Sequence, residues 1–100
     1  NEIRAFISYH EKNVNLSYWR TSTGMEVDLI IGNMDLAIEF KATPRIDSRH
    51  YKGILSLMDD QKVKRKIIVS LDESPRKLQV GIEIYPWQIF CEKLWGGNLI

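Results

Sequence analysis

Two acidic residues and a lysine lie on neighbouring segments of the sequence, and their side chains could together do phosphate chemistry. Asp28 lies in the alternating segment 26–31, whereas Glu39 and Lys41 lie two residues apart in the next alternating segment, 36–42. Mg²⁺ is commonly bound by one or two carboxylates, together with waters and phosphate oxygens. A lysine can orient a water molecule and offset charge that develops in a transition state. We therefore expect a catalytic site in which Asp28 and Glu39 hold Mg²⁺ or Mn²⁺ and Lys41 assists.

A predicted β-hairpin would bring these side chains together. A two-residue loop at Asn33-Met34 places Asp28 opposite Glu39. Side chains alternate between the two faces of a strand, so the same register sorts charged and apolar residues onto opposite faces. The charged face also pairs Glu26 with Lys41, and the apolar face is expected to pair Val27 with Phe40, Leu29 with Ile38, and Ile31 with Leu36.

The opposed acids have two interpretations. Side chains directly across a strand pair lie about 5 Å apart at Cβ, so two like charges there destabilise a sheet. A divalent cation between Asp28 and Glu39 would remove that repulsion. A surface charge ladder, with Glu26 and Lys41 as its ion pair, would offset part of it without a cation. The sequence leaves both interpretations open.

The segments around the hairpin predict an α/β domain. The predicted order is a helix (2–11), three strands (17–22, 26–31 and 36–42), a helix capped by Asp47 or Ser48, two strands (66–71 and 80–85) and a helix (86–94), with 72–77 as a polar loop. Segment 66–71 contains a short continuous apolar run, 67–69, as expected of a central strand that is buried on both faces. A strand meander followed by a helical crossover implies a mixed sheet with helices packed against it.

These motifs resemble a known catalytic signature. Val27-Asp28 followed by Glu39-Phe40-Lys41 is similar to the motif of the PD-(D/E)XK nuclease superfamily, with Val27 in place of the eponymous proline. Segments 18–20, 24–28 and 38–42 more specifically resemble the nuclease-like domain of unknown function that follows the ATPase module in many prokaryotic AAA+ ATPases. The resemblance covers nearly the whole chain and implies a restriction-endonuclease-like core.

The resemblance also implies roles for particular residues. Asp28 and Glu39 would be metal ligands, Lys41 would be the catalytic lysine, and Glu2 would be an assisting carboxylate on the first helix. An acidic residue is also favourable in the first turn of any helix, which is the alternative interpretation of Glu2. The implied activity is Mg²⁺-dependent hydrolysis of phosphodiester bonds in nucleic acid, most simply DNA.

The implied context is a larger protein. We expect residues 1–100 to be one domain and a fragment of a longer chain, because the sequence begins at Asn1 instead of methionine. The resemblance implies that this longer chain also carries the ATPase module. A non-catalytic module of the same fold, which binds DNA or a protein and recruits or regulates the ATPase, is the alternative.

Positive charge is concentrated in the middle of the chain. The net charge is only +1, but residues 41–66 hold eight of the fourteen lysines and arginines and three acidic residues. Such a segment is typical of a surface that faces phosphate, although a solvated helix end has the same composition. We take Arg45, Arg49, His50 and Lys52 as candidate nucleic-acid contacts.

Several other classes of protein are excluded by composition. Cys91 is the only cysteine, so the chain can form neither an internal disulfide nor a cysteine-based zinc site. No apolar run approaches the roughly 20 residues that cross a bilayer. We therefore expect a cytoplasmic domain with no membrane partner.

Overall fold

The chain folds into helices packed on a mixed β-sheet. The computed structural model describes residues 2–9 and 14–99. Their elements, in order, are α1 (Glu2–Tyr9), β1 (Leu16–Arg20), β2 (Glu26–Ile31), β3 (Leu36–Phe40), the 3₁₀ helix η1 (Ser48–His50), α2 (Lys52–Asp60), β4 (Arg65–Ser70), β5 (Arg76–Lys77), β6 (Ile82–Pro86) and α3 (Trp87–Trp95). The predicted α/β class and the predicted order of helix, meander, helix, strands and helix are confirmed.

The sheet joins an antiparallel meander to a parallel core. Its strand order is β1-β2-β3-β4-β6-β5. The pairs β1–β2, β2–β3 and β5–β6 are antiparallel, whereas β3–β4 and β4–β6 are parallel. Parallel neighbours need a long crossover, which α2 supplies between β3 and β4. The carboxyl ends of β3, β4 and β6 consequently lie along one edge of the sheet.

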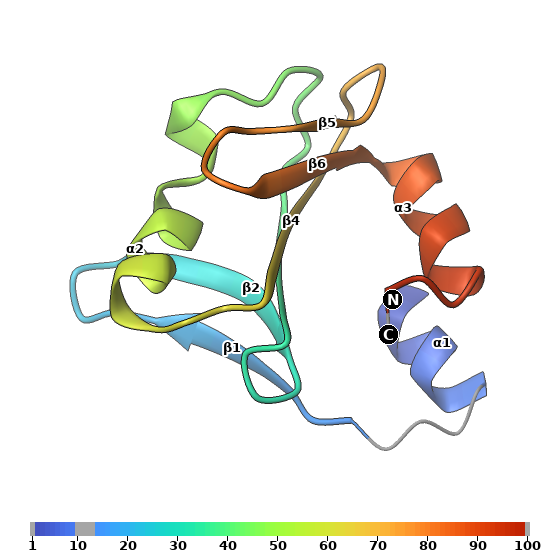
Figure 1. Cartoon of the computed structure of the whole chain (residues 1–100), viewed down its shortest axis with the longest axis horizontal. Helices are drawn as coiled ribbons and strands as arrows, with labels where there is room; N and C mark the ends of the chain where they lie inside the picture. Colours follow the sequence, from blue (N-terminus) through green and yellow to red (C-terminus); the bar gives the residue numbers. More distant parts are fainter. Residues whose placement is uncertain (1, 10–13, 100) are drawn as a thin grey trace.

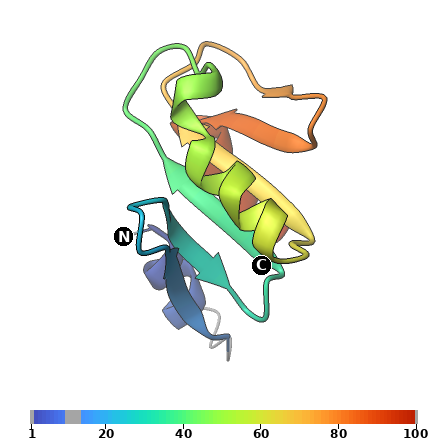
Figure 2. The ribbon, with the colours of Figure 1, turned by 90° about the vertical axis from the view of Figure 1, so that its left-hand side faces the viewer.

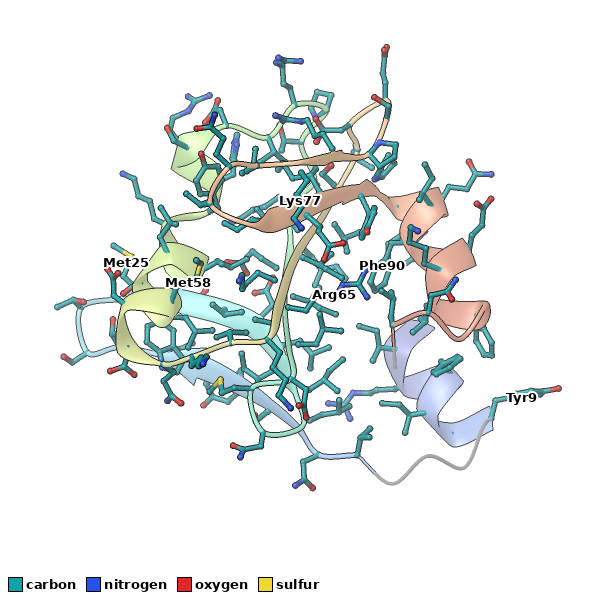
Figure 3. All side chains as sticks on the ribbon, viewed as in Figure 1. Tyr9, Met25, Met58, Arg65, Lys77 and Phe90 are labelled. Carbon is teal, nitrogen blue, oxygen red and sulfur yellow. The ribbon has the colours of Figure 1, made fainter. Side chains whose placement is uncertain are left out.

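Helices cover both faces of this sheet. Helix α2 lies across one face, and α1 and α3 lie side by side on the other (Figures 1 and 2). Phe6 of α1 and Phe90 of α3 are buried in one apolar cluster with Ile38 and Ile67, whereas Ile54 and Leu57 of α2 are buried in a second cluster. Figure 3 shows Phe90 and Arg65 between the sheet and α3, with Met58 on the opposite side. Each face of the sheet therefore has its own core.

The central strand β4 contributes to both cores. Its side chains alternate, so Ile67 and Val69 face α1 and α3 while Ile68 faces α2. All three are at most 3% exposed. This confirms the prediction of a strand that is buried on both faces. None of the helices in the described ranges is long and apolar enough to cross a membrane.

Several predicted boundaries were wrong. The strands predicted at 17–22, 36–42 and 80–85 are Leu16–Arg20, Leu36–Phe40 and Ile82–Pro86. Segment 72–77 is not only a loop, because Arg76 and Lys77 form the edge strand β5 beside β6. Two residues are too few to show an alternating pattern. Asp47 caps η1 and not α2, which begins at Lys52. Pro86 is the last residue of β6 and not the first residue of the last helix, because α3 begins at Trp87.

Candidate functional site

The β2–β3 hairpin has the predicted register near its turn. The predicted pairs Leu29 with Ile38 and Ile31 with Leu36 are present, and the same register pairs Ile30 with Ala37 between them. The backbone pairing of the two strands ends at Leu29 and Ile38. Asp28 and Glu39 therefore lie just beyond the ladder, where the strands have separated and their side chains have room to meet.

A β-bulge in β2 explains why the strands separate there. Ser17 and Trp19 of β1 pair with Ile30 and Val27 of β2, so two steps along β1 match three along β2. The extra residue in β2 moves Val27 to the α2 side of the sheet, where it is buried. The predicted pairing of Val27 with Phe40 on one apolar face was thus wrong. Bulges re-aim side chains and are frequent beside active sites.

The two carboxylates bridge the strands where the backbone ladder stops. The backbone N–H of Asp28 donates to Oε1 of Glu39 (3.2 Å), and the N–H of Phe40 donates to Oδ2 of Asp28 (2.9 Å). Each acid therefore accepts a backbone donor from the opposite strand. These contacts fix the two carboxylates beside each other at the start of β2 and the end of β3.

Glu39 is held in an environment that disfavours its charge. Glu39 is only 4% exposed, whereas Asp28 is exposed. Burial, followed by the neighbouring Asp28 carboxylate, raises the pKa of Glu39 to about 8, and the charge of Lys41 offsets only part of this effect. Near neutral pH and without a cation, Glu39 is thus largely protonated. A positive charge bound beside the two acids would favour the charged form of Glu39.

This pKa predicts that the protein becomes less stable as the pH rises. Between the ordinary Glu value of 4.5 and about 8, the unfolded chain releases a proton that folded Glu39 retains. In EDTA, the free energy of unfolding should therefore fall by about 1–3 kcal/mol from pH 5 to pH 8. This estimate is reduced to allow for solvent that screens the carboxylate. Urea unfolding at both pH values measures the change.

Glu39→Gln is the variant that tests this assignment. It should reduce the pH dependence and be the more stable form at pH 8, because an amide carries no charge there. Glu26→Gln is the matched control, since Glu26 is exposed and belongs to the same hairpin. A Glu39→Gln variant with the full pH dependence of the wild type would contradict the assignment.

The acids and most of the predicted cationic residues line one cavity of about 260 Å³. We call it the carboxylate cavity, and it lies between the hairpin, η1 and the start of α2. Its lining residues are Gly24, Met25, Glu26, Asp28, Glu39, Phe40, Lys41, Arg49, His50, Lys52 and Gly53. The fold thus brings Asp28, Glu39 and Lys41 together with Arg49, His50 and Lys52, although 24 residues of sequence separate the first of these from the last.

Gly53 lets α2 approach the two acids. A Cβ atom at Gly53 would lie 2.0 Å from the carbonyl oxygen of Glu26 and 3.4 Å from Oε2 of Glu39. Glycine costs about 1 kcal/mol relative to alanine within a helix, so its presence in the first turn of α2 indicates a packing requirement. This residue was missed at the sequence level, although a glycine in a predicted helix was the available signal.

Gly53→Ala should destabilise the protein by about 1–3 kcal/mol, despite the better helix propensity of alanine. The added methyl group meets the backbone of β2, which cannot move aside as a flexible side chain can. Denaturant unfolding measures the loss. Ser56→Ala in the same helix is the control and should change stability by less than about 0.5 kcal/mol. Equal stability of Gly53→Ala and the wild type would show that α2 shifts freely.

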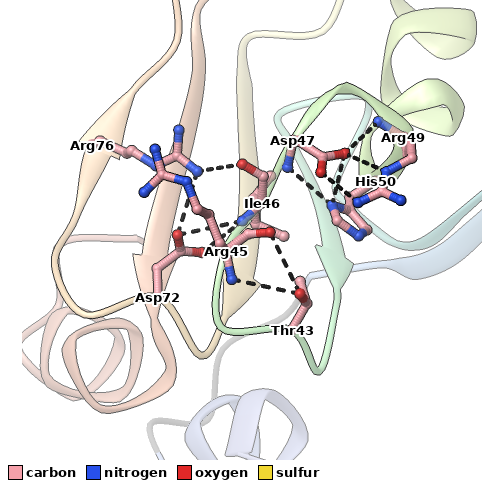
Figure 4. Close-up of polar contacts among 8 residues, drawn as sticks. All are labelled: Thr43, Arg45, Ile46, Asp47, Arg49, His50, Asp72 and Arg76. Carbon is pink, nitrogen blue, oxygen red and sulfur yellow. Dashed lines mark hydrogen bonds and ion pairs between the residues drawn. The ribbon is translucent and has the colours of Figure 1, made fainter.

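The segment before α2 positions His50 on the cavity wall. The carboxylate of Asp47 accepts the N–H of Arg49, and the N–H of Asp47 donates to Nδ1 of His50 (2.9 Å; Figure 4). Because Nδ1 accepts, the neutral imidazole carries its proton on Nε2 and can donate it to a ligand. Two further bonds join Arg49 to Asp47, and the guanidinium holds the pKa of Asp47 well below its usual range. Arg49 is therefore already paired at this wall.

A buried aspartate ties the loop before η1 to the rest of the sheet. Asp72 is 8% exposed, and its carboxylate accepts hydrogen bonds from Ser70 Oγ, the N–H of Ile46 and the guanidinium of Arg76. Arg76 also donates to the carbonyl oxygen of Ile46 (Figure 4). Burial works against the charge of Asp72, but these donors outweigh it and lower its pKa. Sequence patterns gave no sign of this network.

Other predicted features lie apart from the carboxylate cavity. Glu26 forms its ion pair with Arg20 across β1–β2 (3.2 Å), and not with Lys41 as predicted. Arg45 is exposed and does not line the cavity. The side chain of Glu2 lies outside the described residues.

The basic middle segment does not form one continuous surface. Lys64 pairs with Asp35 beside the β2–β3 turn, and Arg65 pairs with Glu83 between β4 and β6. These residues lie at the amino end of β4, whereas Lys41 and Lys52 lie at the opposite end of the parallel strands. The positive residues of segment 41–66 are therefore divided between the two ends of the parallel strands, and those that line the carboxylate cavity all lie within 41–52.

The donor set fits a hard divalent cation with an incomplete protein shell. Asp28 and Glu39 supply carboxylate oxygens. Burial and the neighbouring Asp28 disfavour the charged form of Glu39, and a positive charge there would favour it. In the described part of the chain, no group of three or more His, Cys, Asp or Glu residues could hold a metal ion. One or two carboxylates suffice for Mg²⁺ when waters and phosphate complete the shell, whereas structural zinc requires four ligands.

Fold and site together define a small α/β domain with a two-carboxylate and lysine cavity beside the ends of its parallel strands. The chain belongs to the family described as a domain of unknown function (DUF4143), whose model matches residues 1–90. Comparison with curated proteins and with solved structures found no match.

Proposed function

We propose that this domain hydrolyses phosphodiester bonds of DNA with the help of Mg²⁺ or Mn²⁺, as a PD-(D/E)XK-type nuclease domain attached to an AAA+ ATPase module. The observation that carries the proposal is the carboxylate cavity, in which the buried Glu39 lies against Asp28 and shares the wall with Lys41. Burial beside Asp28 disfavours the charged form of Glu39, and a cation between the two acids would favour that charged form.

Each residue has a distinct role in this proposal. Asp28 and Glu39 would hold the cation, which would polarise a phosphate oxygen and make a water molecule more acidic. Lys41 orients the attacking water and stabilises the negative charge of the pentacoordinate phosphate. His50, with its proton on Nε2, donates to a phosphate oxygen, and Lys52 adds a positive charge at the entrance.

Cleavage of supercoiled plasmid DNA by the 100-residue chain tests the proposal. We expect nicked and linear products with Mg²⁺ or Mn²⁺, and none in EDTA. Ca²⁺ is the matched control and should not support cleavage. It also binds oxygen ligands, but without the octahedral geometry that Mg²⁺ requires. Absence of cleavage with every cation would remove the hydrolytic proposal.

A non-catalytic nucleic-acid-binding module is the second candidate. It is favoured by the small number of protein ligands for a metal in the described ranges, and by the positive residues of segment 41–52. Such a module would bind DNA with a strong dependence on salt and would not respond to Mg²⁺. Calorimetric titration with Mg²⁺ separates the two candidates: binding that Glu39→Ala abolishes supports the enzyme.

A further inference from the structure

A second cavity lies at the carboxyl ends of the three parallel strands. It also has a volume of about 260 Å³, and we call it the tryptophan cavity. It is lined by the last residues of β3 and β4 and by the residues that follow the three strands: Phe40, Lys41 and Ala42 at β3, Val69, Ser70 and Leu71 at β4, and Trp87 after β6. In open α/β sheets, ligands bind preferentially outside the carboxyl ends of the strands. The position of this cavity is therefore that of a binding site.

Large apolar side chains are left open to solvent around this cavity. Leu71 is 57% exposed and Trp87 is 43% exposed. An isolated exposed leucine needs no explanation, but two large apolar residues on the wall of one hollow indicate a surface that is covered in use. The cavity thus offers a ligand an aromatic ring and an aliphatic group.

The tryptophan ring is held in place before any ligand arrives. Trp87 stacks on Phe90 with ring centroids 6.1 Å apart and an interplanar angle of 30°. Phe90 is fully buried and meets Phe40 edge to face, with centroids 6.2 Å apart. The core therefore fixes the ring of Trp87. A rigid aromatic surface loses little conformational entropy when a flat ligand stacks on it.

Lys41 connects this cavity to the carboxylate cavity. It lines both, and its backbone N–H donates to the carbonyl oxygen of Val69 (2.9 Å), which fixes its position between β3 and β4. One side of Lys41 thus offers an apolar, aromatic hollow and the other offers two acids suited to a cation. A nucleotide has the complementary pair of groups, a flat base joined through a sugar to a negatively charged phosphate.

We propose that the tryptophan cavity binds one unpaired base of DNA, stacked on Trp87, while the adjoining phosphate lies at Lys41. The proposal rests on the function assigned above to the carboxylate cavity, and it specifies the substrate as single-stranded or locally unpaired DNA. In a duplex the faces of the bases are covered by their neighbours, so a stacking residue gains access only to a base outside the stack. Trp87 and Leu71 would therefore select unpaired strands.

Fluorescence anisotropy with a labelled oligothymidylate of about twelve nucleotides tests this inference, in EDTA and at fixed salt concentration. We expect the wild type to bind the single strand more tightly than a duplex of the same length. Trp87→Ala should weaken binding of the single strand about tenfold or more, and Trp87→Phe should retain most of it. Leu71→Glu changes an exposed side chain, so it should fold and also weaken binding.

Trp95→Ala is the matched control. Trp95 is similarly exposed, at 39%, but packs on Phe6 of α1 and does not line this cavity. Its removal should leave DNA binding unchanged. Equal binding of single strand and duplex, or unchanged binding by both Trp87→Ala and Leu71→Glu, would overturn the inference even if plasmid is cleaved. Binding that depends on Trp87 without cleavage under any cation would retain the base site and remove the hydrolytic function.

Discussion

Lys41→Ala should reduce Mg²⁺-dependent cleavage of DNA by a factor of about 10² or more, while the variant still binds the cation. Stabilisation of transition-state charge by a single positioned group is typically worth factors of this size. The side chain of Lys41 has no place in the carboxylate bridge between β2 and β3, and its backbone bond to Val69 remains in any variant. Rates of plasmid nicking measure the first effect and calorimetry measures the second.

Asp28→Asn should remove both cleavage and cation binding. The asparagine keeps an oxygen that can accept the N–H of Phe40, so the hairpin should retain its geometry. Comparison of this variant with Lys41→Ala thus separates a loss of the cation from a loss of transition-state stabilisation.

Lys62→Ala is the control for both variants. It removes a positive charge from an exposed residue just beyond α2 and outside the lining of the carboxylate cavity. Its rate should stay close to that of the wild type. Equal rates for all four proteins would contradict any catalytic role of the cavity. If binding of DNA then remained salt-dependent and independent of Mg²⁺, the domain would be a binding module instead.

Local sequence patterns predicted the longer helices and strands but not their departures from regularity. Alternation along β2 and β3 is strong enough to fix the register near the turn, because a slip by one residue would expose the core. The bulge at Asp28 and Leu29 leaves no local mark, since it depends on how β1 pairs with β2. That bulge both moves Val27 to the other core and ends the ladder just before the two acids.

The candidate site was predictable where it depends on short-range order. Glu39 and Lys41 are two residues apart at the end of β3, and Asp28 is opposite through a hairpin, so alternation was sufficient. The predicted two-residue loop was wrong, since the turn spans residues 32–35, but the register is the same. Contributions from distant segments were not predictable. Gly53 matters only because α2 crosses β2 at that point, and Trp87 lies at the neighbouring tryptophan cavity because β6 ends beside β4. Such contacts depend on tertiary packing, which no local pattern records.

Asp72→Ala should cost about 2–4 kcal/mol of unfolding free energy and also disturb the carboxylate cavity. Removing one partner of a buried ion pair leaves the others without compensation, which typically costs about 3–5 kcal/mol, and the partial exposure of Arg76 reduces this figure. The N–H of Ile46 and the hydroxyl of Ser70 lose their acceptor as well. Because Ile46 immediately precedes the Asp47 cap, the segment that positions His50 should loosen.

Two variants separate charge from hydrogen bonding in this network. Asp72→Asn keeps an acceptor oxygen and should cost less than alanine, whereas Arg76→Ala leaves a buried carboxylate that still accepts from Ile46 and Ser70. The lowered pKa of Asp72 adds a pH test, since its stabilisation is present above the unfolded value and is lost as the pH falls below about 4. Urea unfolding from pH 3 to pH 7 should therefore show a steeper acid loss in the wild type than in Asp72→Ala. If the two curves run parallel, the aspartate does not hold the loop, and the shape of the carboxylate cavity must depend on the Asp47 cap and the packing of Gly53 alone.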